Sequence, residues 1–158
     1  DPELSIDRAI DIYRRKGYSE EWINQRLQGK KERKKLTDEW KRAGVKEKQY
    51  AILTNAIYEV WSGMTAKEYK HFKGLKKESL RDNMTNMEIA LNMLAEASAT
   101  ELSKQRNPNG FHQQKQVAKD GGSVAKAARK QLESKLGHGV ISSAKASDCL
   151  PNVEDKNE

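Results

Sequence analysis

The residues best suited to chemistry are the cations of residues 30–35, KKERKK, which are followed by an aromatic side chain at Trp40. Five positive charges this close together can displace counterions from several phosphates of a nucleic acid. A charge run with an interleaved acid, here Glu32, is also typical of a solvated helix face. A second basic cluster further along the chain leaves the same two interpretations open. The candidate residues for binding a nucleic acid or another partner are Lys30, Lys31, Arg33, Lys34, Lys35, Lys73, Lys76, Lys77 and Arg81.

The residue types that support catalysis or metal binding do not form a known pattern. His71, His112 and His138 are far apart in the sequence, without the paired spacing of a zinc site and without a glycine-rich loop for phosphate. Two Glu-x-Lys pairs, at residues 32–34 and 133–135, resemble half of a metal-dependent nuclease motif, but charge-rich helices produce such pairs by chance. The sequence predicts a non-enzymatic protein with no catalytic residue, metal or cofactor, and a small nuclease is the least favoured alternative.

The composition restricts the class of protein and the kind of partner. Apolar residues make up 35% of the 158 residues and charged residues 34%, which suits helices that show a wide charged face to water. The net charge of +7 attracts polyanions and so favours nucleic acid or an acidic protein as partner. One cysteine, Cys149, fits a reducing compartment, and apolar runs stay short of the ~20 residues of a membrane helix. We expect a cytoplasmic protein that does not contact a membrane.

The clearest signal for an element that positions these residues lies at residues 85–106. Thr85 stands three residues before Glu88, the arrangement in which a hydroxyl and a carboxylate cap the first turn of a helix. Apolar residues then recur at helical spacing on most sides and leave only a narrow polar stripe, so we expect a central helix whose apolar rows are core. The first row lines one face and consists of Met87, Ala90, Leu91, Leu94 and Leu102 together with the small polar Ser98. The second apolar row is Ile89, Met93 and Ala97, and the polar stripe is Glu88, Asn92 and Glu96.

Apolar periodicity and capping residues predict further helices before this central one. One ends at Gly17, a second begins after Ser19, and two more follow Gly44 at residues 50–62 and 65–73. Residues 28–35 hold no apolar side chain, so this stretch is either a solvated helical segment or an exposed link. Its glycine weakens the helical option.

The chain after the central helix is predicted to form two shorter helices. The first covers residues 111–120 and ends at Gly121 and Gly122, and Ser123 caps the second. The pair resembles a helix-turn-helix only superficially, because Ser123 and Gln131 occupy positions where that motif needs apolar residues. A simple helical hairpin is therefore favoured.

These elements predict an all-α protein, a single helical bundle of six or seven helices. The bundle occupies residues 1–142, and residues 143–158 form a polar, flexible tail that Val140 and Ile141 are expected to anchor. An apolar strip on the first helix, or around Trp22 and Trp40, is the candidate surface for a homo-oligomer.

Several blocks of the sequence resemble a known family. They are DPELSIDRAI, GYSEEWINQRL, LTDEWKRAGV, YAILTNAIY, GMTAKEYKHFKGLKKESLRDNMTNMEIALNMLAEAS and GGSVAKAARKQLE. Together they are similar to the C-terminal half of DNA-damage-inducible protein D and of related prophage antirepressors, up to about residue 142. In that family an N-terminal Bro-type domain, thought to contact DNA, precedes this half, so we expect the chain, which starts without Met, to be a piece of a longer protein.

The resemblance implies a regulatory function without catalysis. The best-known member inhibits RecA-type recombinase filaments, and the phage relatives are regarded as antirepressors. We therefore expect a non-enzymatic interaction and assembly domain of a DNA-damage-inducible or prophage regulator, with a RecA-type recombinase or a phage repressor as partner. The alternative is a helical domain that binds nucleic acid directly through the basic residues named above.

Overall fold

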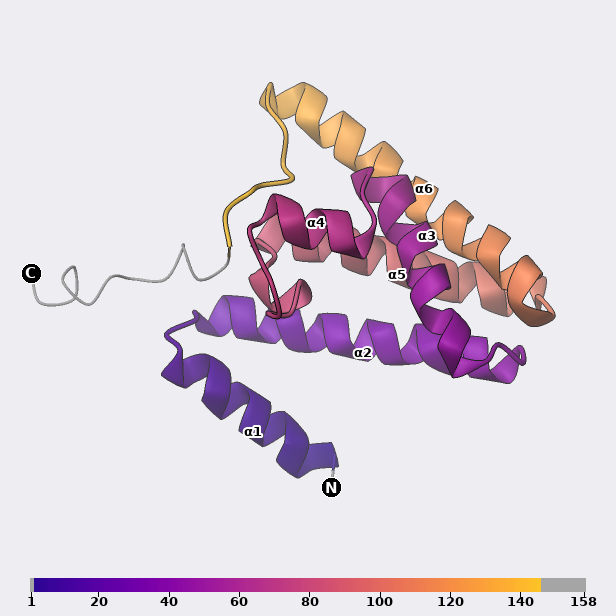
Figure 1. Ribbon diagram of the computed structural model, residues 1–158, viewed down its shortest axis with the longest axis horizontal. Coiled ribbons are helices and arrows are strands. Elements are labelled where there is room, and N and C mark those ends of the chain that lie inside the picture. The colour runs from indigo at the N-terminus through magenta and orange to yellow at the C-terminus, as the bar shows by residue number, and fades with distance from the viewer. Residues whose placement is uncertain (1, 146–158) are drawn as a thin grey trace, which may run out of the picture.

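The computed structural model describes residues 2–145, with side chains from Leu4 onward, and every regular element in this range is a helix (Figure 1). This confirms the predicted all-α class. The predicted tail lies largely outside the described residues, as does Cys149. Within the described range the elements are α1 (Pro2–Arg15), α2 (Glu20–Arg42), η1 (Glu47–Gln49), α3 (Tyr50–Ser62), α4 (Ala66–Phe72), η2 (Arg81–Asn83), α5 (Asn86–Arg106) and α6 (Gly110–Leu136), where η marks a short 3-10 helix.

The helix α5 occupies the centre of the bundle. It packs against α2 on one side and α6 on the other, and α3 packs mainly against α6. Figure 1 shows α1 running away from this group at an angle, joined to α2 by a short turn. The core side chains come from all of these layers except the outer part of α1, where apolar residues remain exposed. The largest fully buried apolar side chains are Trp40, Trp61, Tyr69, Ile23, Leu36, Leu53, Ile57 and Met84.

The predicted capping residues begin their helices as expected. The Thr85 hydroxyl accepts from the Glu88 amide, and the Glu88 carboxylate accepts from the Thr85 amide. Thr65 and Glu68 form the same reciprocal pair at the start of α4. The Ser19 hydroxyl accepts from an amide in the first turn of α2. Each cap satisfies amides that lack partners within the helix, which fixes where that helix begins.

The helix α2 crosses residues 28–35 without a break, so the solvated helical interpretation of this stretch is confirmed. Gly29 is buried on its inner side, where Met93 and Ile89 of α5 are the nearest side chains. Tertiary packing therefore outweighs the low helix propensity of glycine at this position.

The predicted break at Gly121 and Gly122 is wrong, because α6 is one continuous helix, and so neither a helical hairpin nor a helix-turn-helix is present at residues 111–136. The two glycines lie where α6 contacts α5 and α3. A Cβ atom at Gly121 would lie 2.7 Å from the Ala95 carbonyl oxygen, and one at Gly122 would lie 3.0 Å from the Ile57 carbonyl oxygen. The glycines thus let α6 approach both α5 and α3 closely, a role that local sequence does not distinguish from helix breaking.

Residues 140–141 pack against the core after α6 ends, as predicted. Val140 and Ile141 are partly buried against the core cluster, and the Val140 amide donates to the Glu133 carboxylate over 2.9 Å. Within residues 2–145, no helix is both long and apolar enough to cross a membrane.

Candidate interaction surface

The polar stripe of α5 faces the interior of the protein. The residue exposures are 0% for Glu88, 5% for Asn92 and 1% for Glu96. Met87 and Leu94, from the row predicted as core, are instead 42% and 38% exposed. The prediction for this apolar row is therefore partly wrong. This orientation is possible because Lys73, Arg81 and Arg33 supply partners for the buried carboxylates, since an unpaired charge is costly to bury, whereas exposing two apolar side chains costs little.

Glu88 is the first of the buried carboxylates and joins three segments. It accepts hydrogen bonds from the Tyr69 hydroxyl and from the Lys73 Nζ, the latter over 2.8 Å. Burial, and then the charge of Glu88, raise the pKa of the Tyr69 phenol, so it stays a donor. The Lys73 ammonium, which is fully buried, also donates to the carbonyl oxygens of Ser142 and Ala144 over 2.8 and 2.6 Å. One cation thus holds α4, α5 and the segment after α6 together.

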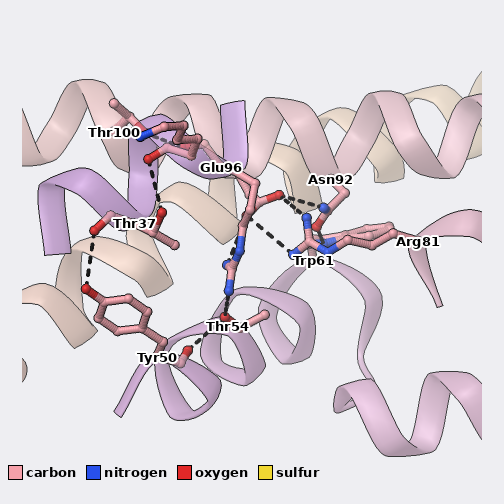
Figure 2. A network of polar contacts seen from close by, with 10 residues as sticks. Thr37, Tyr50, Thr54, Trp61, Arg81, Asn92, Glu96 and Thr100 are labelled. Carbon is pink, nitrogen blue, oxygen red and sulfur yellow. Dashed lines mark hydrogen bonds and ion pairs between the residues drawn. The ribbon is translucent and has the colours of Figure 1, made fainter. Parts of the chain in front are cut away.

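Glu96 is the centre of the second network, in which Arg81 and Asn92 converge on its carboxylate (Figure 2). Arg81 Nη1 donates over 2.6 Å and Asn92 Nδ2 over 2.9 Å. Arg33 Nη1 reaches the same carboxylate from α2 over 3.2 Å. Asn92 accepts in turn from the Trp61 indole over 3.2 Å. Two arginines and an amide compensate the charge that α5 buries here.

A third buried contact joins α2, α5 and α6. The Ser103 hydroxyl donates to Glu39 Oε1 and accepts from Gln114 Nε2, each over 2.8 Å. A hydrogen bond from Arg42, and a weaker effect of Ser103, hold the pKa of the Glu39 carboxyl below its usual value. The polar side of α5 is therefore bound to partners inside the protein along its length, and the opposite side of the helix faces solvent.

That opposite side borders a shallow groove between α2 and α5. The groove has a volume of about 330 Å³ and combines an apolar floor from α5 with polar side chains from α2. Leu94 is the most exposed apolar residue on this floor. The residues that line the groove are Gln25, Glu32, Ala90, Met93, Leu94 and Ala97.

The basic residues predicted on α2 differ in how free their charges are. Arg33 points inward to Glu96, while Lys34 and Lys35 form ion pairs with Asp38 and Glu32 over 3.1 and 3.3 Å. Lys30 lies over the Tyr13 ring at 5.8 Å. Lys31 is exposed and forms no ion pair within the described residues.

The second predicted cluster is likewise divided. Lys73 and Arg81 bind the buried Glu88 and Glu96, whereas Lys76 and Lys77 are exposed. The two predicted clusters meet inside the protein, where Arg33 and Arg81 share Glu96. On the surface, Lys76 instead lines a hollow of about 410 Å³ together with side chains from α4. These α4 side chains are not among the binding residues predicted from the sequence. The other residues of this hollow are Lys67, Lys70, His71 and Leu75.

The family model of the DinD C-terminal domain matches residues 18–140. The chain belongs to this family. The matched range of this DinD C-terminal domain runs from the start of α2 to the segment after α6. It includes the groove and the three buried networks, apart from the Ser142 and Ala144 carbonyls that Lys73 binds. The match confirms the resemblance for the C-terminal domain. Comparisons with curated proteins and with solved structures returned no match.

Proposed function

We propose that this DinD C-terminal domain binds a protein partner through the groove between α2 and α5 and acts without catalysis. The observation that carries the proposal is the inverted orientation of α5, which buries its carboxylates and exposes Met87 and Leu94. An apolar surface with a polar rim is typical of protein-binding sites.

The groove favours a helix with an apolar face as the bound element. Its floor contains two alanines, which allow close approach of a partner helix, and Met93, whose flexible thioether adapts to different side chains. Gln25 and Glu32 on the α2 side supply hydrogen-bond acceptors for the edge of such a helix. A helix that presents leucine-sized residues at i, i+3 and i+4 matches this arrangement.

Membership of the DinD family supports a partner that acts in the response to DNA damage. The resemblance makes a RecA-type recombinase filament the first candidate and a phage repressor the second. In either case the domain would act by occupying a surface that the partner needs for its own assembly or for DNA.

The direct test is strand exchange by a RecA-type recombinase on single-stranded DNA with the domain added. We expect inhibition by the unchanged protein and its loss on Leu94→Glu, which places a charge in the groove. Ile52→Glu is the matched control, because Ile52 is an exposed apolar residue of α3 that does not line the groove. Unchanged strand exchange at saturating protein would exclude the recombinase as partner. Equal inhibition by the Leu94→Glu protein would exclude the groove.

Direct nucleic-acid binding is the second candidate function. It is favoured by the net charge of +7 and by Lys31, Lys76 and Lys77, which are exposed and whose side chains form no ion pair with any residue that the structure describes. The test is the salt dependence of DNA binding after Lys30, Lys31, Lys34 and Lys35 are replaced by glutamine, which leaves Arg33 on the buried Glu96. An unchanged salt slope would show that these residues are not the contact.

A further inference from the structure

A row of four lysines runs along the outer side of α6. Lys115, Lys119, Lys126 and Lys130 follow one another at intervals of four, seven and four residues, which return to nearly the same side of an α-helix. At a rise of about 1.5 Å per residue, the row extends over about 22 Å. Lys119, Lys126 and Lys130 are exposed and Lys115 is half-buried. We call these four residues the α6 lysine row.

In the described part of the chain the charges of the α6 lysine row are unpaired, whereas most cations of residues 30–35 on α2 have partners. The two carboxylates of α6, Asp120 and Glu133, form ion pairs with Arg106 and Arg129. The Val140 amide also donates to Glu133. Within residues 2–145, the four lysines form no ion pair or hydrogen bond. The helix therefore has arginine partners for its acids and leaves its lysines available to an external anion.

The packed side of α6 fixes the direction in which the row points. Gly121 and Gly122 fit against backbone atoms of α5 and α3, so α6 cannot rotate or move without breaking close contacts. A single continuous helix of 27 residues thus presents the four cations in a fixed direction. The groove between α2 and α5 shares no residue with it.

We propose that the α6 lysine row binds the phosphate backbone of a nucleic acid without reading its sequence. The intervals between the lysines correspond to about 6 and 10 Å along the helix, which is two to three times the ~3.4 Å between successive charges of one strand. Lysine provides point charges rather than the planar fork that reads base edges. Lysine is depleted at protein–protein interfaces relative to the rest of the surface, and this favours nucleic acid over an acidic protein.

The test compares two variants with equal loss of charge. One carries Lys115→Gln, Lys119→Gln, Lys126→Gln and Lys130→Gln; the other carries Lys30→Gln, Lys31→Gln, Lys34→Gln and Lys35→Gln on α2. Binding to fluorescent DNA of about 20 nucleotides, single-stranded or duplex, is measured by anisotropy from about 50 to about 200 mM salt. Each neutralised phosphate contributes about 0.9 to the slope of log K against log salt for duplex and about 0.7 for a single strand.

We expect the α6 variant to lose about 3.6 from the slope on duplex and about 2.8 on single strands, and the α2 variant to keep most of it. The unchanged protein should then weaken about 150-fold on duplex across this salt range, whereas the α6 variant changes little. Arginine at the same four positions should preserve the slope, which controls for altered folding. No binding by the unchanged protein at low salt, or a loss confined to the α2 variant, would overturn the proposal.

A poly-glutamate chain serves as the probe for an acidic protein. If it bound as tightly as DNA and lost the same affinity in the α6 variant, the row would be assigned to an acidic protein and the proposal would be wrong. The strand-exchange assay with Leu94→Glu tests the groove separately. Failure of one proposal is therefore distinguishable from failure of the other.

Discussion

Replacing Gly121 by alanine tests whether close approach of α6 to α5 holds the bundle together. The added Cβ would lie 2.7 Å from the Ala95 carbonyl oxygen, 2.7 Å from the Ala99 Cβ and 2.8 Å from the Ala99 amide nitrogen. Two of these atoms belong to the backbone of α5, so the helices must separate for the methyl group to fit. Such overpacking costs about 3 kcal/mol at the upper end of its usual range. The better helix propensity of alanine returns about 1 kcal/mol, which leaves a net loss of about 2 kcal/mol.

Gly29→Ala is the matched control, with the opposite expected sign. Gly29 is also a buried helical glycine facing α5, but the nearest atom to its added Cβ would be the Met93 Cγ at 3.7 Å, an ordinary contact. The methyl group fits there, so only the propensity gain of about 1 kcal/mol remains and the protein becomes more stable.

The free energy of unfolding of the three proteins is measured by urea titration, and the unfolding midpoint by the helical circular dichroism signal on heating. For a domain of this size, 1 kcal/mol corresponds to about 2–4 °C, so we expect Gly121→Ala to lower Tm by about 4–8 °C and Gly29→Ala to raise it by about 2–4 °C. A Gly121→Ala protein as stable as the unchanged one would refute the packing argument. A Gly29→Ala protein that is less stable than the Gly121→Ala protein would also refute it.

Three further predictions concern the buried polar groups. Lys73→Met should lower the free energy of unfolding by about 3–5 kcal/mol, because it leaves Glu88 buried without its cation. Adding Glu88→Gln should restore part of that loss, as measured by urea titration. A double variant no more stable than Lys73→Met alone would contradict this explanation. Hydrogen bonding, chiefly from Arg42, keeps the folded-state pKa of the Glu39 carboxyl below its usual value of 4.5. The ionised carboxylate therefore stabilises the fold above pH 4.5, and this stabilisation is lost as pH falls. Glu39→Gln should accordingly reduce the dependence of the free energy of unfolding on pH at acidic pH. Burial, assisted by a hydrogen-bonded carboxylate, raises the pKa of Tyr13 from 10.0 to about 12. The stability from its protonated phenol is therefore present below pH 10 and lost as pH rises toward 12, and Tyr13→Phe should show a shallower loss of stability across that interval, whereas an unchanged slope would show that Tyr13 does not contribute.

The features read correctly from the sequence are those that depend on neighbours along the chain. Thr85 and Glu88 cap a helix through contacts three residues apart, so the start of α5 is determined by residues that are close in the sequence. The candidate site was less accessible to this reasoning. Arg33 and Lys31 are nearly adjacent in one basic run, yet one binds a buried carboxylate and the other faces solvent. Composition alone does not separate these two roles.

The amino-acid sequence by itself determined that this protein is a helical bundle, where most of its helices begin and end, and that α5 lies at its centre. Tertiary structure alone decided which side of α5 is inside, because Glu96 needs Arg33, which is 63 residues away, to compensate its charge. It also decided that Gly121 continues a helix, since the glycine is required by a neighbouring backbone rather than by a turn. Both outcomes depend on contacts between distant segments, and such contacts cannot be inferred from the pattern of neighbouring residues in the sequence.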